Sequence, residues 1–306
     1  MTTAALFPGQ GSQFVGMGRD LYEAEPAARA VFEAADSQLG YALSALCFEG
    51  PEDALTETAV QQPALFATSL AAWTVMQARG EADVAFMAGH SLGEFSALVA
   101  AGSLSFADGL ALVQRRGQLM KRAGQEQPGA MAAVLGLDVK QVADACAAAT
   151  DQTGKVVQVA NDNCPGQIVI SGDVQALDGA VELLQAAGAR KIVNLPISIA
   201  AHSPLMASVA GEFAQAVEET PINTPSVPVI GNVSAGPLTD PAAIRQELKS
   251  QLTAPVAWTA SIQYLLGEGV DTFIETGPGD VLLGLVKRID RSAQRIKFEV
   301  GAAAWN

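Results

Sequence analysis

The chain has 306 residues, of which 49% are hydrophobic and 16% charged, so it can bury a sizeable core and is neither disordered nor fibrous. Eighteen basic and 32 acidic residues give a net charge of −14, which opposes broad attraction to nucleic acid or to an anionic membrane. Because no apolar run has the length of a membrane span or a signal peptide, we expect a cytoplasmic protein that binds neither nucleic acid nor membranes.

The first 125 residues alternate short apolar runs with longer helical patterns. Two brief apolar runs that end in glycine, at 4–9 and 84–89, are typical of buried parallel strands. The helical patterns lie at roughly 16–39, 62–79, 92–102 and 107–123. This alternation predicts an α/β fold built on a parallel sheet.

Between 128 and 198 the order of elements changes to β, α, β, β, α, β. The six segments are AMAAVLGL, VKQVADACAAAT, KVVQVAN, QIVISG, VQALDGAVELLQAAG and RKIVNLPI. Their order is that of a ferredoxin-like module, and the turn-rich DNCPG joins the two middle strands.

The α/β pattern resumes after this module, which is therefore an insertion rather than a tail. Further strands are predicted at 227–232 and 272–277, and further helices near 204–219, 240–252 and 258–267. We expect a large α/β domain made of residues 1–127 and 199–306, with a small ferredoxin-like subdomain at 128–198.

Ser91 lies between Gly89 and Gly93 in the segment GHSLG. VAFMAG before it is predicted to be a strand and LGEFSALVAAG after it a helix, so Ser91 stands at the tight turn called a nucleophile elbow. The alternative is a structural glycine turn that carries a serine by chance.

A serine hydroxyl needs a base before it can attack a substrate, and the chain has two histidines. His90 is a poor base for Ser91, because neighbouring side chains on a sharp turn point in different directions. His202 lies between a predicted strand and a predicted helix, where its side chain can reach across the end of a sheet. A buried core histidine is the alternative, but the need for a base favours His202 as the catalyst. No acid that orients this imidazole can be identified, and a carbonyl group is the other candidate.

The helical segment DGLALVQRRGQLMKR places a cation among apolar side chains. Leu112, Val113, Leu119 and Met120 form a stripe on one face, and Arg116 falls in its middle. A buried guanidinium needs an anion, and a substrate carboxylate would supply one. The alternative is an arginine that reaches the surface or pairs with a distant carboxylate.

Two glycine-rich loops, at 7–18 and 276–280, lack the third glycine of a dinucleotide-binding fingerprint. The first loop can instead lend a backbone N–H to an oxyanion hole, together with the N–H of Leu92. Cys47, Cys146 and Cys164 have no metal-binding or disulfide pattern. We expect neither a metal nor a redox cofactor.

Six segments in order along nearly the whole chain resemble the malonyl-CoA:acyl carrier protein transacylases of bacterial fatty acid synthesis. They are FPGQGSQ, GHSLGE, QRRG, NDNCPGQIVISG, AAHSPLM and ETGPGDVLLGLVKRI. The resemblance implies an α/β-hydrolase-like domain with a ferredoxin-like insert. It also implies that coenzyme A thioester is a substrate rather than a cofactor.

The resemblance further assigns a function to six residues. Ser91 would accept the acyl group, His202 would be the base, and the main-chain carbonyl of Gln251 would hold the imidazole. The backbone N–H groups of Gln10 and Leu92 would form the oxyanion hole, and Arg116 would bind the substrate carboxylate. The chain departs from many malonyl-selective relatives in having Ala201, instead of a bulky aromatic residue, before the base.

The expected partners are malonyl-CoA and acyl carrier protein, and we expect a monomer. Five cations against one acid at 287–297 suggest that the acidic carrier protein docks near Lys287, Arg288 and Arg291; a solvated C-terminal face is the alternative. Competing functions are a serine esterase or thioesterase, a transacylase of broader acyl selectivity and a nucleotide-binding module.

Overall fold

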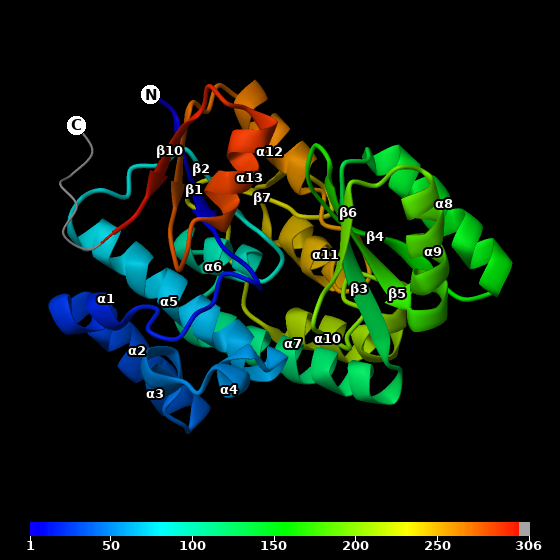
Figure 1. Ribbon diagram of the computed structural model, residues 1–306. Coiled ribbons are helices and arrows are strands. Elements are labelled where there is room, and N and C mark those ends of the chain that lie inside the picture. The colour runs from blue at the N-terminus through cyan, green and yellow to red at the C-terminus, as the bar shows by residue number, and fades with distance from the viewer. Residues whose placement is uncertain (300–306) are drawn as a thin grey trace.

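The structure is a computed structural model and describes residues 1–299, which form a larger part and a smaller part (Figure 1). The larger part contains a six-stranded sheet in which only the last strand, β8, runs antiparallel to its neighbour. In spatial order its strands are β10 (Gln294–Lys297), β9 (Thr272–Glu275), β1 (Thr3–Phe7), β2 (Phe86–Gly89), β7 (Val229–Ile230) and β8 (Pro237–Leu238). The predicted parallel sheet is confirmed.

Helices cover both faces of the large sheet, as the burial of strand β1 shows. Its residues from Ala4 to Phe7 are fully buried, and alternate side chains point to opposite faces. Ala5 and Phe7 join a core with α5, α6 and α7, whereas Ala4 and Leu6 join a second core with α12 and α13. The helices of the larger part are α1 (Arg19–Ala24), α2 (Pro26–Leu39), α3 (Leu43–Glu49), α4 (Glu52–Thr56), α5 (Thr58–Ala78), α6 (Gly93–Ala100), α7 (Phe106–Glu126), the 3₁₀ turn η1 (Pro204–Met206), α10 (Ala207–Glu219), α11 (Pro241–Gln251), α12 (Trp258–Gly267) and α13 (Val281–Ile289).

The prediction of one helix at 16–39 is wrong in one respect, because the structure has two helices there. Glu25 separates α1 from α2 in an extended conformation, with ψ of 111°. The cause is Pro26, the first residue of α2, which disfavours a helical conformation in the residue before it. Helices α3, α4 and α13 and the short strands β8 and β10 were not predicted.

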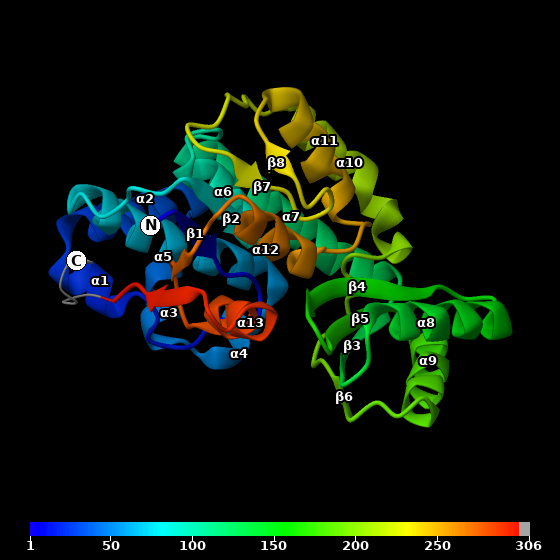
Figure 2. The ribbon, with the colours of Figure 1, turned by 90° about the horizontal axis from the view of Figure 1, so that it is seen from above.

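The smaller part has the predicted β, α, β, β, α, β order. Its sheet is antiparallel with the spatial order β4-β5-β3-β6, and helices α8 and α9 cover one face, as Figure 2 shows from above. Its elements are β3 (Gly129–Leu135), α8 (Val139–Thr153), β4 (Val157–Cys164), β5 (Gln167–Asp173), α9 (Val174–Ala186) and β6 (Lys191–Asn194). We propose 128–198 as the extent of this subdomain and 1–127 with 199–306 as that of the large domain, of which 300–306 lie outside the described residues.

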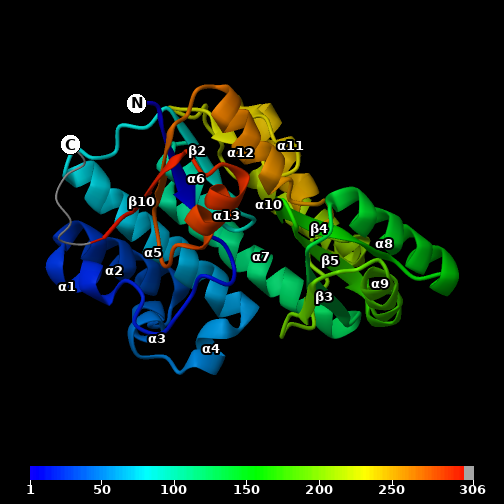
Figure 3. The same ribbon diagram turned by 45° about the horizontal axis from the view of Figure 1, so that its top comes forward.

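The two parts meet along β4, the edge strand of the small sheet (Figure 3). The backbone N–H of Asp162 donates to the carbonyl of Val256 at 2.9 Å, and the N–H of Val256 donates to Ala160 at 2.8 Å. The small sheet is thus continued by a strand-like contact with the segment between α11 and α12. A free strand edge is covered in this way.

The register of the large sheet brings three loops together. Phe7 at the end of β1 pairs with Gly89 at the end of β2, and Ala88 of β2 pairs with Ile230 of β7. Because these strands are parallel, the loops that follow them lie along one edge of the sheet, where ligands bind in open α/β folds.

Candidate active site

Ser91 occupies the turn between β2 and α6. Its φ angle of 50° is in the left-handed region, which residues other than glycine rarely adopt. The flanking glycines are required by space: a Cβ at Gly89 would lie 2.0 Å from the carbonyl of Gly93, and one at Gly93 would lie 2.0 Å from the carbonyl oxygen of Phe7. The turn therefore has the tight, strained geometry of a nucleophile elbow.

His202 lies beside Ser91 although 111 positions separate them in the sequence. Its Nε2 is 2.8 Å from Ser91 Oγ. Its Nδ1 is 2.8 Å from the main-chain oxygen of Gln251 and 3.2 Å from that of Ala254. Because carbonyl oxygens can only accept, Nδ1 carries the proton and the Nε2 lone pair faces the serine hydroxyl.

The surroundings of His202 keep its imidazole neutral. The residue is only 4% exposed, and burial, followed by the nearby Arg116 cation, lowers its pKa to about 3. At neutral pH the ring can therefore accept a proton from Ser91. The left-handed φ of 56° at His202 is a second strained backbone position in the site.

Arg116 projects from α7 to the same hydroxyl. Its Nη2 donates to Ser91 Oγ at 3.0 Å, its Nη1 donates to Gln62 Oε1 at 2.9 Å, and its guanidinium lies 5.7 Å from the centre of the Phe95 ring. The side chain is 1% exposed and forms no ion pair within residues 1–299, and its Nε has no hydrogen-bond partner there. Burial lowers its pKa to about 10, so it remains a cation at neutral pH, ready for an external anion.

The two predicted oxyanion-hole residues flank the elbow. Leu92 is buried just before α6, and Gln10 is exposed in the loop after β1. That loop lies against the elbow, since a Cβ at Gly9 would be 2.3 Å from the carbonyl oxygen of His90. Within residues 1–299, the backbone N–H groups of Gln10 and Leu92 donate to no protein acceptor.

The sequence matches the family model described as an acyl transferase domain over residues 5–305. The chain belongs to this acyl transferase family. It is 48% identical over 298 residues to the malonyl CoA-acyl carrier protein transacylase of Bacillus subtilis, covering 96% of this chain and 92% of the relative. It is 45% identical over 286 residues to the enzyme of the same name from Escherichia coli K12, covering 94% and 92%.

Solved structures give the same result. The crystal structure of an acyl carrier protein S-malonyltransferase from Vibrio cholerae has a TM-score of 0.93 and 44% identity, covering 97% of this chain and 96% of that one. A complex of a type II PKS acyl-carrier protein with its malonyl-transacylase has a TM-score of 0.94 and 41% identity, with the same coverage. The predicted family and fold are confirmed.

Asn232 is a residue of this acyl transferase site that the sequence did not reveal. Its Oδ1 accepts from the backbone N–H of Ser91 at 2.6 Å, and its Nδ2 donates to the carbonyl of Gly89 at 2.7 Å. The side chain thus braces the first half of the elbow turn, from Gly89 to Ser91. Its position at the end of the apolar run 227–232 was the available signal, because polar residues that follow parallel strands meet at one edge.

His90 takes no part in the contact with Ser91 Oγ. Its Nε2 lies 2.8 Å from Asn163 Oδ1 in β4, and its ring packs edge-on against Trp258 at 5.3 Å between centres. Burial lowers its pKa. His90 therefore ties the elbow to the small subdomain, while His202 approaches the hydroxyl.

The cations near the C-terminus are only partly available to a partner. Arg288 donates to Gln167 Oε1 in the small subdomain at 3.0 Å, Arg295 donates to the carbonyl of Ala293 at 2.5 Å, and Lys297 pairs with Glu299 at 3.0 Å. Lys287 and Arg291 are exposed and form no ion pair within the described part of the chain.

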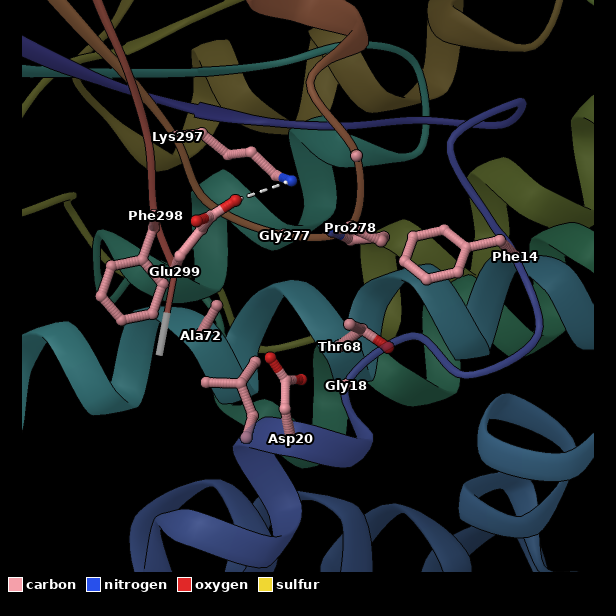
Figure 4. Close-up of a pocket in the computed structure, with 12 residues that line it drawn as sticks. Phe14, Gly18, Asp20, Thr68, Ala72, Gly277, Pro278, Lys297, Phe298 and Glu299 are labelled. Atoms are coloured by element: carbon pink, nitrogen blue, oxygen red, sulfur yellow. Dashed lines mark ion pairs between the residues drawn. The ribbon is translucent and has the colours of Figure 1, made fainter. Parts of the chain in front are cut away.

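One cavity of about 210 Å³ lies away from this site, between α1, α5, the loop after β9 and the residues after β10 (Figure 4). Phe14, Pro278 and Phe298 line it, together with Asp20 and the ion-paired Lys297. None of the six predicted site residues borders it.

No cluster of three His, Cys, Asp or Glu side chains within residues 1–299 could hold a metal ion. The three cysteines are free and buried. None of the described helices combines the length and apolar character needed to cross a membrane.

Proposed function

We propose that this acyl transferase moves a malonyl group from coenzyme A to the phosphopantetheine thiol of an acyl carrier protein, through an ester on Ser91. One observation carries the proposal: Ser91 Oγ contacts both a neutral imidazole and a buried guanidinium, at 2.8 and 3.0 Å. A hydrolase acting on an uncharged ester needs the imidazole but not the buried cation. An acyl group that ends in a carboxylate needs both.

In the first half-reaction Ser91 Oγ attacks the thioester carbonyl of malonyl-CoA and its proton passes to His202 Nε2. The negative charge that develops on the carbonyl oxygen is stabilised by the N–H groups of Gln10 and Leu92. The carbon–sulfur bond then breaks, and the departing sulfur takes the proton from the imidazolium. Malonyl-serine and free coenzyme A result.

In the second half-reaction the phosphopantetheine thiol gives its proton to His202 and attacks the malonyl-serine ester. The bond between the acyl carbon and Ser91 Oγ breaks, and the serine oxygen regains the proton from His202. Gln251 contributes its main-chain carbonyl, which stabilises the protonated ring through Nδ1 in both halves.

Arg116 supplies the preference for an acidic acyl group. Its guanidinium is held by Gln62 at one nitrogen, and Phe95 lies beside it, so little movement is needed to meet a carboxylate. The cation also lowers the pKa of His202, so the base is deprotonated before substrate arrives.

Brief exposure to malonyl-CoA or acetyl-CoA, followed by intact-protein mass spectrometry, tests the proposal. We expect a malonyl adduct that is absent in Ser91→Ala, that forms faster than an acetyl adduct, and that disappears when holo acyl carrier protein is added. Rapid hydrolysis without carrier protein, or equal labelling by both thioesters, would support an esterase instead. Methylmalonyl-CoA in the same assay tests whether Ala201 admits a branched acyl group.

The carrier protein is acidic, and we propose that it docks near Lys287, Arg288 and Arg291. Lys287 and Arg291 contribute exposed charge, whereas Arg288 also links α13 to the small subdomain. We further propose that the protein acts as a monomer without a cofactor, because both half-reactions use only side chains and backbone groups of one chain. We also propose that it acts in the cytoplasm.

A further inference from the structure

Glu94 is a buried carboxylate three residues after the nucleophile, in the first turn of α6. Its side chain has no solvent exposure, and it forms no ion pair in the described part of the chain. A carboxyl group buried in a helix is unfavourable unless polar groups compensate it. Its position therefore calls for a specific reason.

The two oxygens of Glu94 accept hydrogen bonds from two different segments. Oε1 accepts from the backbone N–H of Asn232 at 3.1 Å, and Oε2 accepts from the side-chain amide of Gln251. The same Gln251 amide also donates to the main-chain oxygen of Ser91 at 3.0 Å. The carboxylate thus connects the loop after β7 with the end of α11.

These two partners are the groups that hold the reacting side chains. Asn232 braces the backbone of Ser91, and the main-chain carbonyl of Gln251 holds Nδ1 of His202. Glu94 is therefore one hydrogen bond from the support of the nucleophile and one from the support of the base.

The site also explains why a carboxylate is required. Two N–H donors converge on Glu94, so both of its oxygens must accept, and a side-chain amide has only one acceptor oxygen. Burial, followed by the nearby Glu247, raises the pKa of Glu94 well above its usual value, and the hydrogen bonds from Asn232 and Gln251 and, last, the Arg116 charge favour the ionised form. Glu247 is itself occupied by the N–H groups of Val233 and Ser234.

We propose that Glu94 is a positioning residue that sets the distance between Ser91 Oγ and His202 Nε2 through Asn232 and Gln251. Both Ser91 and His202 have strained left-handed backbones, which persist only where surrounding contacts fix them. The inference rests on the proposed acyl transfer, but it concerns the reactivity of Ser91 towards any electrophile.

Glu94→Gln tests the proposal, with Glu247→Gln as the matched control. Both residues are buried carboxylates that accept two N–H groups, but Glu247 binds neither Asn232 nor Gln251. Three measurements are made on each variant: kcat and KM for malonyl transfer, the rate at which a fluorophosphonate labels Ser91, and the Tm.

In Glu94→Gln we expect kcat and the labelling rate to fall together by about 10- to 100-fold, because a small misplacement of reacting groups has effects of this size. KM for malonyl-CoA should change by less than about 2-fold, since Arg116 is untouched. Glu247→Gln should lower the Tm about as much as Glu94→Gln does, but its kcat and labelling rate should both stay within about 3-fold of wild type.

Three results would overturn the inference: wild-type rates in Glu94→Gln, equal rate losses in both variants, or a loss confined to KM. If Glu94→Gln does not fold, Gln251→Met breaks the same hydrogen bond from the other side and keeps the main-chain carbonyl. Wild-type labelling in that variant would also refute the proposal. Failure of the wild-type protein to transfer malonyl, with normal labelling, would reject the proposed function instead.

Discussion

Replacing Arg116 with glutamine separates substrate recognition from the reactivity of Ser91. Burial lowers the pKa of Arg116 from 12.5 to about 10, and one pKa unit corresponds to about 1.4 kcal/mol. The pKa is depressed in the folded state, so carrying the charge at pH 7 costs the folded protein about 3 kcal/mol. Arg116→Gln removes this cost while losing the bonds to Gln62 and to Ser91 Oγ, and the Tm should stay within about 5 °C of wild type.

A substrate carboxylate would neutralise the same poorly solvated cation. If pairing recovers about 3 kcal/mol, the lost interaction corresponds to about 100- to 1000-fold in rate. We therefore expect kcat/KM for malonyl-CoA to fall by about that factor in Arg116→Gln. The value for acetyl-CoA, which has no free carboxylate, should change by less than about 10-fold.

Both kcat/KM values are obtained by supplying malonyl-CoA or acetyl-CoA and following acyl transfer to holo acyl carrier protein by mass spectrometry. Fluorophosphonate labelling of Ser91 serves as the control for an intact nucleophile and base. An unchanged ratio of malonyl to acetyl transfer, with normal labelling, would refute the assignment of Arg116 as the carboxylate-binding residue.

Four further predictions concern the base, the elbow and the carrier protein. Because the pKa of His202 is lowered to about 3, the rate at which a fluorophosphonate labels Ser91 should be nearly constant from about pH 8 to about pH 5. A fall in this rate with a midpoint near pH 6.5 would contradict the lowered pKa. As pH falls from about 6.5 towards 3, His202 binds a proton in the unfolded chain but not in the folded protein. This group alone should therefore lower the free energy of unfolding by up to about 1.4 kcal/mol per pH unit, and the Tm should fall accordingly. Gly93→Ala should lower the Tm by several degrees or prevent folding, because the added Cβ would clash with the carbonyl oxygen of Phe7. Gly211→Ala, at an open position in a helix, is the control and should raise the Tm slightly. Equal Tm values in the two variants would show that the elbow tolerates a Cβ. Charge reversal at Lys287 and Arg291 should raise KM for carrier protein at low salt without affecting malonyl-serine formation, and an unchanged KM would exclude this docking face.

Local sequence patterns determined much of the fold and part of the candidate site. The apolar run at 4–9 predicted a buried parallel strand, and the small subdomain followed from its βαββαβ order. The glycines around Ser91 predicted a tight turn, and helical spacing placed Arg116 on a buried face. These features depend on neighbours within a few residues, so periodicity and steric limits are visible in a single chain.

Only the tertiary structure decided which distant groups meet. The group that holds His202 is the main-chain carbonyl of Gln251; the resemblance to the transacylases pointed to it, but no side-chain pattern could, because every residue has a main-chain carbonyl. Asn232 and Glu94 contact each other across 138 positions, so no local spacing relates them. The short strand β8 pairs over only two residues and lacks a repeat long enough to detect. A single sequence records local preferences, whereas a site assembled from several loops depends on how the sheet brings those loops to one edge.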